Sequence, residues 1–154
     1  LSGCSARAIY ARVRRLGGRN PHPTPRQILN KSDEVLRAAG LSRAKVSYLR
    51  DLATHAKGTE FPSLEDLDSM DDGAIVEHLT GIKGIGVWSV QMLLIGYLAR
   101  PDVLPVSDLG IRKGFKYMLG LSALPDEQSI TRRGEKWKPY RTVASWYLWQ
   151  ASYL

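Results

Sequence analysis

Apolar residues recur three and four positions apart along almost the whole chain. This spacing is typical of α-helices with one buried face, and no segment shows a convincing strand-like alternation of apolar and polar residues. The sequence therefore predicts an all-α protein. The expected helices cover residues 2–16, 25–29, 32–39, 43–56, 71 or 72 to 79, 87–98, 107–119 and 126–136, with a last helix from 139 onward.

Residues that favour helix ends stand at several of these boundaries. Ser42 can cap the helix 43–56, and Ser63-Leu-Glu-Asp66 resembles a capping box. Pro139 suits the first position of the last helix, because proline lacks the N–H group that would have no partner there. These signals predict where individual helices begin.

Two helices carry expectations about burial. Residues 87–98 are nearly all apolar, so this helix is expected to be buried on most sides. In the helix 107–119, the apolar positions follow helical spacing and are expected to point inward. These inward positions are Ile111, Phe115, Met118 and Leu119.

A glycine-rich turn between two helices is the most informative stretch. It reads Leu79-Thr-Gly-Ile-Lys-Gly-Ile-Gly-Val-Trp-Ser-Val-Gln91. Glycine permits positive φ and close backbone approach, and amides near Gly84 and Gly86 would point outward at the start of the next helix. A phosphate oxygen fits that position, and Lys83 adds a cation. The pattern predicts a grip on a nucleic-acid backbone, although glycines alone could equally serve a tight helix–helix corner.

A single aspartate, Asp108, follows one helix and one loop after this turn. It stands at the expected start of the helix 107–119, twenty positions after Trp88. The helix dipole there favours the ionised carboxylate, while a cleft wall would raise its pKa. Two interpretations are open at this point, a helix cap at Ser107 or Asp108 and a functional carboxylate.

Composition and charge narrow the class of protein. The 154 residues are 44% hydrophobic, and 22 Lys plus Arg stand against 15 Asp plus Glu, a net charge of +7. The basic excess fits a polyanionic partner and equally a merely soluble basic surface. The single cysteine, Cys4, excludes a disulfide framework or a structural zinc or iron–sulfur site built from several thiolates of this chain. No apolar run approaches the roughly 18 residues of a membrane span, so an intracellular protein without a membrane partner is expected.

Aromatic residues are concentrated at the end of the chain. Six of the 13 lie in the last 18 positions, and Trp146, Tyr147 and Trp149 are among them. An enzyme that acts on a base takes it out of the stack and holds it against a flat surface, and indole faces attract positively charged alkylated rings. For Trp146 and Tyr147, a place in the core under the last helix is the preferred expectation.

Four segments in order carry a resemblance to a known family. The turn and its helices resemble the helix–hairpin–helix motif, and together with the aspartate they resemble the helix–hairpin–helix (HhH-GPD) DNA glycosylase superfamily, in particular its DNA-3-methyladenine glycosylase II (AlkA-like) branch. The resemblance implies a two-lobed, all-α fold with the active-site cleft between the lobes. The lobes would cover 1–102, with the helix–hairpin–helix at about 71–98, and 103–154. The four segments are 41–53, 79–92, 104–114 and 135–149.

The implied activity is that of a monofunctional DNA glycosylase of base excision repair. Such an enzyme hydrolyses the N-glycosidic bond of an alkylated purine, of the 3-methyladenine type, flipped out of duplex DNA, and leaves an abasic site. By this resemblance Asp108 is the catalytic carboxylate, and Trp149 and Trp88 match base-pocket aromatics. Trp88 also stands where strand-cleaving relatives carry a lysine nucleophile, so no lyase activity is expected. Met92, one turn further, stands in the pocket where some relatives have an aromatic residue.

The resemblance also implies binding roles for the hairpin. Its DNA-backbone contacts would come from Lys83, Gly84, Ile85 and Gly86. No cofactor is required and no iron–sulfur cluster is expected, but a structural Na⁺ or K⁺ could bind the carbonyls of Thr80, Ile82 and Ile85. The partner is double-stranded DNA containing alkylated bases, bound by a monomer in the cytoplasm and nucleoid of a bacterium or in the nucleus of a eukaryote. The three histidines lack metal-ligand spacing and are expected at the surface; they are His22, His55 and His78.

The resemblance begins inside a motif at Leu1, where family members have a longer lead-in. The N-terminus is therefore expected to be truncated or the lobe to be smaller than usual, and Leu1 is a candidate for the residue that fills the gap left by a flipped base. Two other functions are open. One is a non-catalytic helix–hairpin–helix DNA-binding module, which would need neither Asp108 nor Trp149. The other is an unrelated helical interaction protein whose basic charge only gives solubility.

Overall fold

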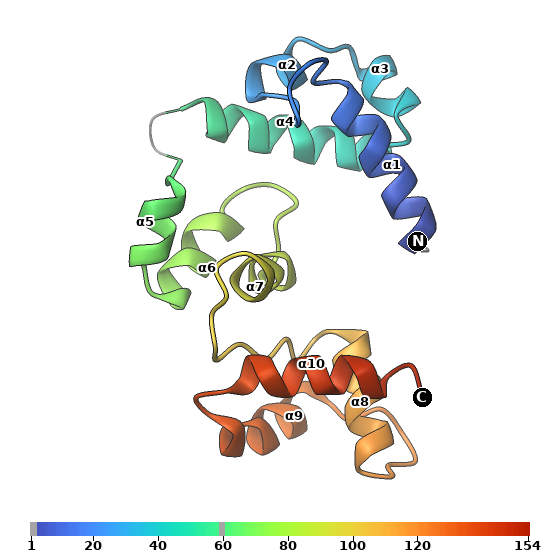
Figure 1. The fold of residues 1–154 in the computed structure, drawn as a ribbon, viewed down its shortest axis with the longest axis vertical. Coiled ribbons are helices and arrows are strands. Elements are labelled where there is room, and N and C mark those ends of the chain that lie inside the picture. The colour runs from blue at the N-terminus through green and yellow to red at the C-terminus, as the bar shows by residue number, and fades with distance from the viewer. Residues whose placement is uncertain (1–2, 59–60) are drawn as a thin grey trace. The chain divides into compact units, whose positions relative to one another are not determined.

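A computed structural model describes residues 3–58 and 61–154 (Figure 1), and every regular element in these ranges is a helix. The prediction of an all-α protein is confirmed. None of the helices within these ranges combines the length and the apolar character of a membrane span. Leu1, the candidate gap-filling residue, lies outside the described residues. The helices are α1 (Gly3–Arg15), α2 (Pro25–Leu29), α3 (Asp33–Ala38), α4 (Arg43–Lys57), α5 (Leu64–Ser69), α6 (Asp72–Thr80), α7 (Val87–Gly96), α8 (Leu109–Met118), α9 (Glu127–Gly134), the short 3₁₀ helix η1 (Glu135–Trp137) and α10 (Arg141–Ala151).

Side-chain caps set several of the helix starts. The Ser42 side chain accepts a hydrogen bond from Lys45 N at 3.2 Å, where α4 begins. Ser63 and Asp66 form the predicted capping box, with Asp66 N donating to Ser63 Oγ at 3.1 Å and Ser63 N donating to Asp66 Oδ2 at 2.8 Å. These bonds satisfy N–H groups that have no partner within the helix, so neighbours in the sequence fix these boundaries.

The start of the last helix differs from the prediction. α10 begins at Arg141, two residues after Pro139, which was expected at the first helical position. The first N–H groups of α10 find acceptors on another segment, because Arg141 N donates to Asp102 Oδ1 at 3.3 Å and Thr142 N donates to Pro101 O at 3.0 Å. Tertiary hydrogen bonds, rather than the proline, therefore determine where this helix starts.

The chain divides into two compact units. The first contains the residues up to Met70 together with Glu77–Ile85, and the second contains Asp71–Val76 together with Gly86–Leu154. This boundary differs from the expected lobes 1–102 and 103–154, which stay a prediction. In the first unit, α2 and α3 pack against α4. The buried cluster of this unit consists of Ile28, Leu36, Val46 and Ala53.

In the second unit, α8 packs across α10 (Figure 1). Ile111 and Phe115 point inward as predicted, but Met118 and Leu119 are exposed, so the prediction is wrong for these two. They follow the last turn of α8 that packs into the core, where the helix ends. The core cluster of this unit consists of Leu104, Ile111, Phe115, Ile130 and Leu148.

α7 is less buried than its apolar sequence predicts. Val90, Leu94 and Ile95 are buried, but the side chains of Val87 and Trp88 in the first turn are 51% and 47% exposed. The expected burial on most sides is therefore wrong for this turn. The Trp88 indole needs a polar partner for its N–H group, and it finds one on another element instead of entering the core.

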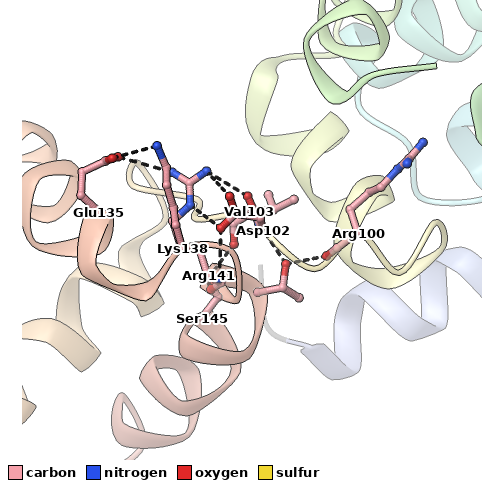
Figure 2. Close-up of polar contacts among 8 residues, drawn as sticks. Arg100, Asp102, Val103, Glu135, Lys138, Arg141 and Ser145 are labelled. Carbon is pink, nitrogen blue, oxygen red and sulfur yellow. Dashed lines mark hydrogen bonds and ion pairs between the residues drawn. The ribbon is translucent and has the colours of Figure 1, made fainter.

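The loop between α7 and α8 is fastened to the beginning of α10 (Figure 2). Arg141 donates from Nε and Nη2 to the two carboxylate oxygens of Asp102, at 2.6 and 2.8 Å. The buried Thr142 hydroxyl accepts from Val103 N at 3.0 Å and donates to Arg100 O at 2.6 Å. Because this loop leads directly into α8, these bonds also position the residues where α8 begins.

Candidate active site

Asp108 is the N-cap of α8. Its Oδ1 accepts a hydrogen bond from Ile111 N at 2.9 Å, which satisfies one of the N–H groups at the start of the helix. The cap interpretation is therefore correct. It does not exclude a second role, because an ionised carboxylate accepts several hydrogen bonds and this side chain is only partly buried.

Two indole groups from other elements complete the surroundings of this carboxylate. Trp149 of α10 donates from Nε1 to Asp108 Oδ1 at 2.9 Å, and Trp88 of α7 donates from Nε1 to Asp108 Oδ2 at 2.8 Å. The donors are 41 and 20 positions away in the sequence. The structure thus brings Asp108, Trp149 and Trp88 into one cluster, which we call the carboxylate cluster.

The donors of the carboxylate cluster decide the charge of Asp108. Partial burial raises the pKa of this carboxyl, but hydrogen bonds from Trp149, Ile111 N and Trp88 outweigh burial and hold the pKa below its ordinary value. A hydrogen bond donated to the charged form of an acid stabilises that form. Asp108 is therefore an ionised group at neutral pH, with donors on both of its oxygen atoms.

The hydrogen bonds to Asp108 use the N–H edge of each indole, and Trp149 also packs against the core cluster of the second unit. Trp146 of α10 stands edge-on to Trp149, with ring centroids 5.4 Å apart at 80°. Trp146 and Tyr147 are themselves 53% and 69% exposed, so the expectation that they fill a core is wrong. The face of α10 that enters the core carries Ser145 and Leu148 instead.

The remaining predicted positions among the described residues make no hydrogen bond to Asp108. Met92 is half-buried on α7, one turn after Trp88, and its place in a base pocket stays a prediction. His22, His55 and His78 are exposed, as expected. Within residues 3–58 and 61–154, no group of three or more His, Cys, Asp or Glu side chains is arranged to hold a metal ion.

The glycine turn is held by α4. Gly84 has a φ of +85°, and a Cβ atom at this position would overlap the ring of Tyr48. Three residues further along α4, Asp51 Oδ2 accepts from Lys83 N at 2.8 Å. Gly84 therefore needs to be glycine both for its backbone conformation and for the close approach of an aromatic ring.

Only some of the backbone donors in the turn are available to a ligand. Lys83 N is bound by Asp51, and Ile85 N donates to Ile82 O at 3.1 Å. Among the described residues, none accepts a hydrogen bond from the N–H group of Gly84 or Gly86. Gly86 is also the N-cap of α7 and brings no side-chain acceptor to the first N–H groups of that helix. These donors would suit an anion.

The carbonyls predicted to hold a cation belong to the same turn. Thr80, Ile82 and Ile85 offer neutral oxygen ligands, which suit Na⁺ or K⁺. Ile82 O already accepts the N–H of Ile85, but a carbonyl oxygen has a second lone pair. The donor set therefore fits a monovalent cation, and the cation itself stays a prediction.

Sequence reasoning missed the two side chains that hold the turn. Tyr48 and Asp51 lie on one face of α4, three residues apart, but nothing in the sequence links them to a turn more than 30 positions later. The sequence also predicted that Trp88 and Trp149 stack on a base, but it did not predict that their N–H groups bind Asp108. A buried or half-buried indole usually finds an acceptor, which was the available signal.

Comparison with known proteins relates this geometry to a family. The family model described as "HhH-GPD superfamily base excision DNA repair protein" matches residues 2–139. The chain belongs to the HhH-GPD superfamily. The predicted family is therefore confirmed. In this HhH-GPD chain, α6, the glycine turn and α7 form the helix–hairpin–helix, and Asp108 follows it.

A yeast protein resembles the HhH-GPD chain over its whole length, in sequence and in structure. "DNA-3-methyladenine glycosylase 1" of Schizosaccharomyces pombe is 37% identical over 154 residues, which cover 100% of this chain and 68% of that protein. The structure of the S. pombe 3-methyladenine DNA glycosylase Mag1 in complex with abasic DNA matches this chain with a TM-score of 0.94 and 37% identity. That match covers 100% of this chain and 75% of the Mag1 chain.

The AlkA-like branch named from the sequence is only loosely supported. A probable bifunctional transcriptional activator and DNA repair enzyme AlkA of Mycobacterium tuberculosis is 35% identical over 72 residues. Those residues cover 47% of this chain and 14% of that protein. The S. pombe Mag1 match, by contrast, covers the whole of this chain.

Proposed function

We propose that this HhH-GPD protein is a monofunctional DNA glycosylase that acts as a monomer on alkylated purines, of the 3-methyladenine type, in duplex DNA. It hydrolyses the N-glycosidic bond and leaves an abasic site. The observation that carries this proposal is the ionised Asp108 carboxylate, fixed by the N–H groups of Trp149 and Trp88. The similarity to the S. pombe 3-methyladenine DNA glycosylase Mag1 supports the substrate class.

The chemical role of Asp108 follows from its charge. As the base leaves, positive charge develops on the deoxyribose, and a fixed anion nearby stabilises that oxocarbenium-like state. The hydrogen bonds that hold the pKa of Asp108 below its ordinary value make it a weak base. Electrostatic stabilisation, together with orientation of the attacking water, therefore suits this carboxylate better than removal of a proton from that water.

The indoles suit the proposed substrate. An enzyme of this kind flips the damaged nucleotide out of the duplex, and many alkylated purines carry a positive charge and an already weakened glycosidic bond. The faces of Trp149 and Trp88 attract such rings by stacking and cation–π interaction, each contributing about 0.5–2 kcal/mol. No strong acid is then needed to help the base leave.

Trp88 also argues against strand cleavage. A lyase would need an amine at this position to form a Schiff base with the sugar, and the indole N–H here is bound to Asp108. We expect no covalent protein–DNA adduct when the reaction is treated with borohydride. Trapping of such an adduct would contradict the monofunctional assignment.

The hairpin supplies the proposed DNA contact. The amides of Gly84, Ile85 and Gly86 and the Lys83 side chain bind phosphate oxygen atoms, with Gly84 and Gly86 as the main donors because Ile85 N is already bound within the turn. A monovalent cation on the carbonyls of Thr80, Ile82 and Ile85 would stiffen the turn and add positive charge near the phosphate. These contacts fix the position of DNA without reading its sequence.

The decisive experiment is release of methylated bases from alkylated duplex DNA by the native chain and by Asp108→Asn. Asparagine is as good a helix cap as aspartate, so the variant should fold, but it lacks the negative charge and the second acceptor oxygen that Trp88 binds. We expect its single-turnover rate to fall by at least about 100-fold. Asp126→Asn is the matched control, because Asp126 caps α9 in the same way, accepting from Ser129 N at 2.7 Å.

The outcomes separate the enzyme from the alternative functions. Excision at the native rate by Asp108→Asn would exclude Asp108 as the catalytic group. Salt-dependent DNA binding without any base release would favour the non-catalytic DNA-binding module. Absence of salt-dependent DNA binding would favour the helical interaction protein.

A further inference from the structure

α8 carries two glycines one helical turn apart, Gly110 and Gly114. Both lie on the side of α8 that meets α10, since the atoms nearest to each of them include residues of that helix. Glycine in a helix weakens it relative to alanine, so two glycines in a ten-residue helix need a structural reason.

Gly114 provides the first reason. It is buried, and a Cβ atom there would overlap the backbone of Leu148. The missing side chain lets the backbones of α8 and α10 approach closely at this point, and α10 cannot retreat by a simple side-chain rotation. Gly114 therefore sets the crossing of the two helices.

Gly110 lies one turn closer to the start of α8, at the carboxylate cluster. A Cβ atom there would stand 2.8 Å from Trp149 Cδ1, 3.3 Å from Trp149 Nε1 and 3.0 Å from Asp108 Oδ1. The first distance is shorter than side-chain carbon atoms tolerate. The methyl group of an alanine would therefore press on the edge of the indole at the point where its N–H group meets the carboxylate.

We propose that Gly110 is a positioning residue for the reaction, because its lack of a side chain leaves the space in which Trp149 reaches Asp108. This inference rests on the proposed function. Gly110 touches neither the base nor the sugar in this mechanism; it acts through the Trp149 indole. The role is distinct from the packing role of Gly114, although the two glycines share one face of the same helix.

The substitution Gly110→Ala tests the proposal with a single methyl group. Alanine favours helices more than glycine does, so a loss of activity could not come from a weaker α8. Gly96→Ala is the matched control, because Gly96 is also in a helix of the second unit and a Cβ atom there would meet nothing within 4 Å. Three measurements apply to both variants: the melting temperature, single-turnover base excision, and NMR of the Trp149 indole N–H and the Asp108 carboxyl.

We expect Gly110→Ala to keep its melting temperature within about 4 °C of the native chain. Its excision rate should fall by about tenfold or more, as when a preorganised donor is disturbed. The Trp149 indole resonance should shift, and the pKa of Asp108 should rise toward its ordinary value as a donor is lost. Gly96→Ala should match the native chain in all readouts. A native excision rate with an unchanged indole resonance in Gly110→Ala would overturn the proposal.

A double variant shows whether Gly110 acts through Trp149. Trp149→Ala removes both indole atoms near Gly110. Adding Gly110→Ala in that background should therefore change the excision rate by less than about twofold and leave the pKa of Asp108 where Trp149→Ala alone puts it. An equally large effect in that background would overturn the proposal. If Gly110→Ala alone fails to fold, the double variant should fold again; failure of both would also overturn it.

The test also separates this proposal from the proposed function. If the native chain released no methylated base, the glycosylase assignment would fail. The indole resonance and the carboxyl titration of Gly110→Ala would still report whether this glycine positions Trp149 against Asp108.

Discussion

The glycine turn and the carboxylate cluster are built in opposite ways. The turn consists of residues adjacent in the sequence, and it presents backbone N–H groups at Gly84 and Gly86. The carboxylate cluster collects side chains from positions 88, 108 and 149 and joins them by side-chain hydrogen bonds. Each depends on a helix that supplies contacts from outside, α4 for the turn and α10 for the cluster.

This difference assigns separate tasks to the two regions. A backbone surface cannot distinguish one base from another, because every nucleotide carries the same phosphate. In the proposed mechanism, the Asp108 carboxylate, held by Trp149, Trp88 and Ile111 N, acts only where positive charge develops on the sugar. Changes in the turn should therefore alter affinity for all DNA alike, while changes in the cluster should alter the rate of the chemical step.

The largest effect is expected for Gly114→Ala. Its methyl group would overlap the backbone of Leu148 and force α8 away from α10. We expect a loss of about 3 kcal/mol in the free energy of unfolding, at the upper end for overpacking, and a corresponding fall in excision. Denaturant unfolding beside Gly96→Ala measures it. A free energy of unfolding equal to that of the control would mean that the crossing of α8 and α10 tolerates a side chain.

Gly84→Ala should affect the other region strongly. A φ of +85° costs a non-glycine residue about 1–2 kcal/mol, and the added methyl group also meets the Tyr48 ring. We expect binding of undamaged and alkylated duplexes to weaken together, measured by fluorescence anisotropy. Gly120→Ala is the control, because Gly120 has a φ of +59° but open space around it. A variant that lost affinity only for alkylated duplexes would contradict the assignment of the turn to phosphate contacts that every duplex offers.

Trp149→Phe should change the pH dependence rather than DNA affinity. It removes the donor to Asp108 Oδ1, so the pKa of Asp108 rises from its lowered value. Activity needs the ionised form, so the acid limb of the pH–rate profile moves to higher pH. The rate at neutral pH should fall roughly tenfold, because a hydrogen bond to a charged group contributes about 1.5–3 kcal/mol.

The same substitution has a consequence for stability. A carboxyl with a lowered pKa in the folded state stabilises the fold above its unfolded pKa, and this contribution is lost as the pH falls through the folded pKa. Trp149→Phe should therefore reduce the difference in unfolding free energy between neutral and acidic pH. An unchanged acid limb together with unchanged acid stability would show that the indole N–H does not control this carboxyl.

The smallest effect is expected for Lys83→Gln. The side chain is exposed and acts as a single charge beside the turn, while its backbone N–H stays bound to Asp51. We expect modestly weaker binding to any duplex, and a slope of log affinity against log salt that is smaller by about 1. Titrations at several salt concentrations measure it, and an unchanged slope would remove Lys83 from the phosphate contact.

Much of the fold could be predicted from the sequence because its signals are local. Capping residues such as Ser42 and Ser63 bond to N–H groups three positions away, and helical spacing identified Ile111 and Phe115 as core residues. Pro139 misled because the first N–H groups of α10 are bound by Asp102 and Pro101, a contact across about 40 residues that no local pattern contains.

The candidate site divides in the same way. The helix start and the position after the glycine turn left a cap and a functional carboxylate both open for Asp108, and only the resemblance to the family singled it out as the candidate catalytic group. The orientation of Trp88 could not be predicted. The apolar sequence of α7 predicts a buried side chain, but the Trp88 indole donates its N–H to the Asp108 carboxylate instead. Tyr48 and Asp51 could not be linked to the turn without the packing of α4.

Asp108 closes the first turn of a helix and carries the proposed chemistry with the same oxygen atoms. A descendant of this chain that had lost excision would still be under selection to keep aspartate, asparagine, serine or threonine there, simply to hold α8 together. The residue at position 108 is thus a poor marker of activity in a survey of related chains. The paired tryptophans at 88 and 149, which α8 does not require for its own start, are the features to trace.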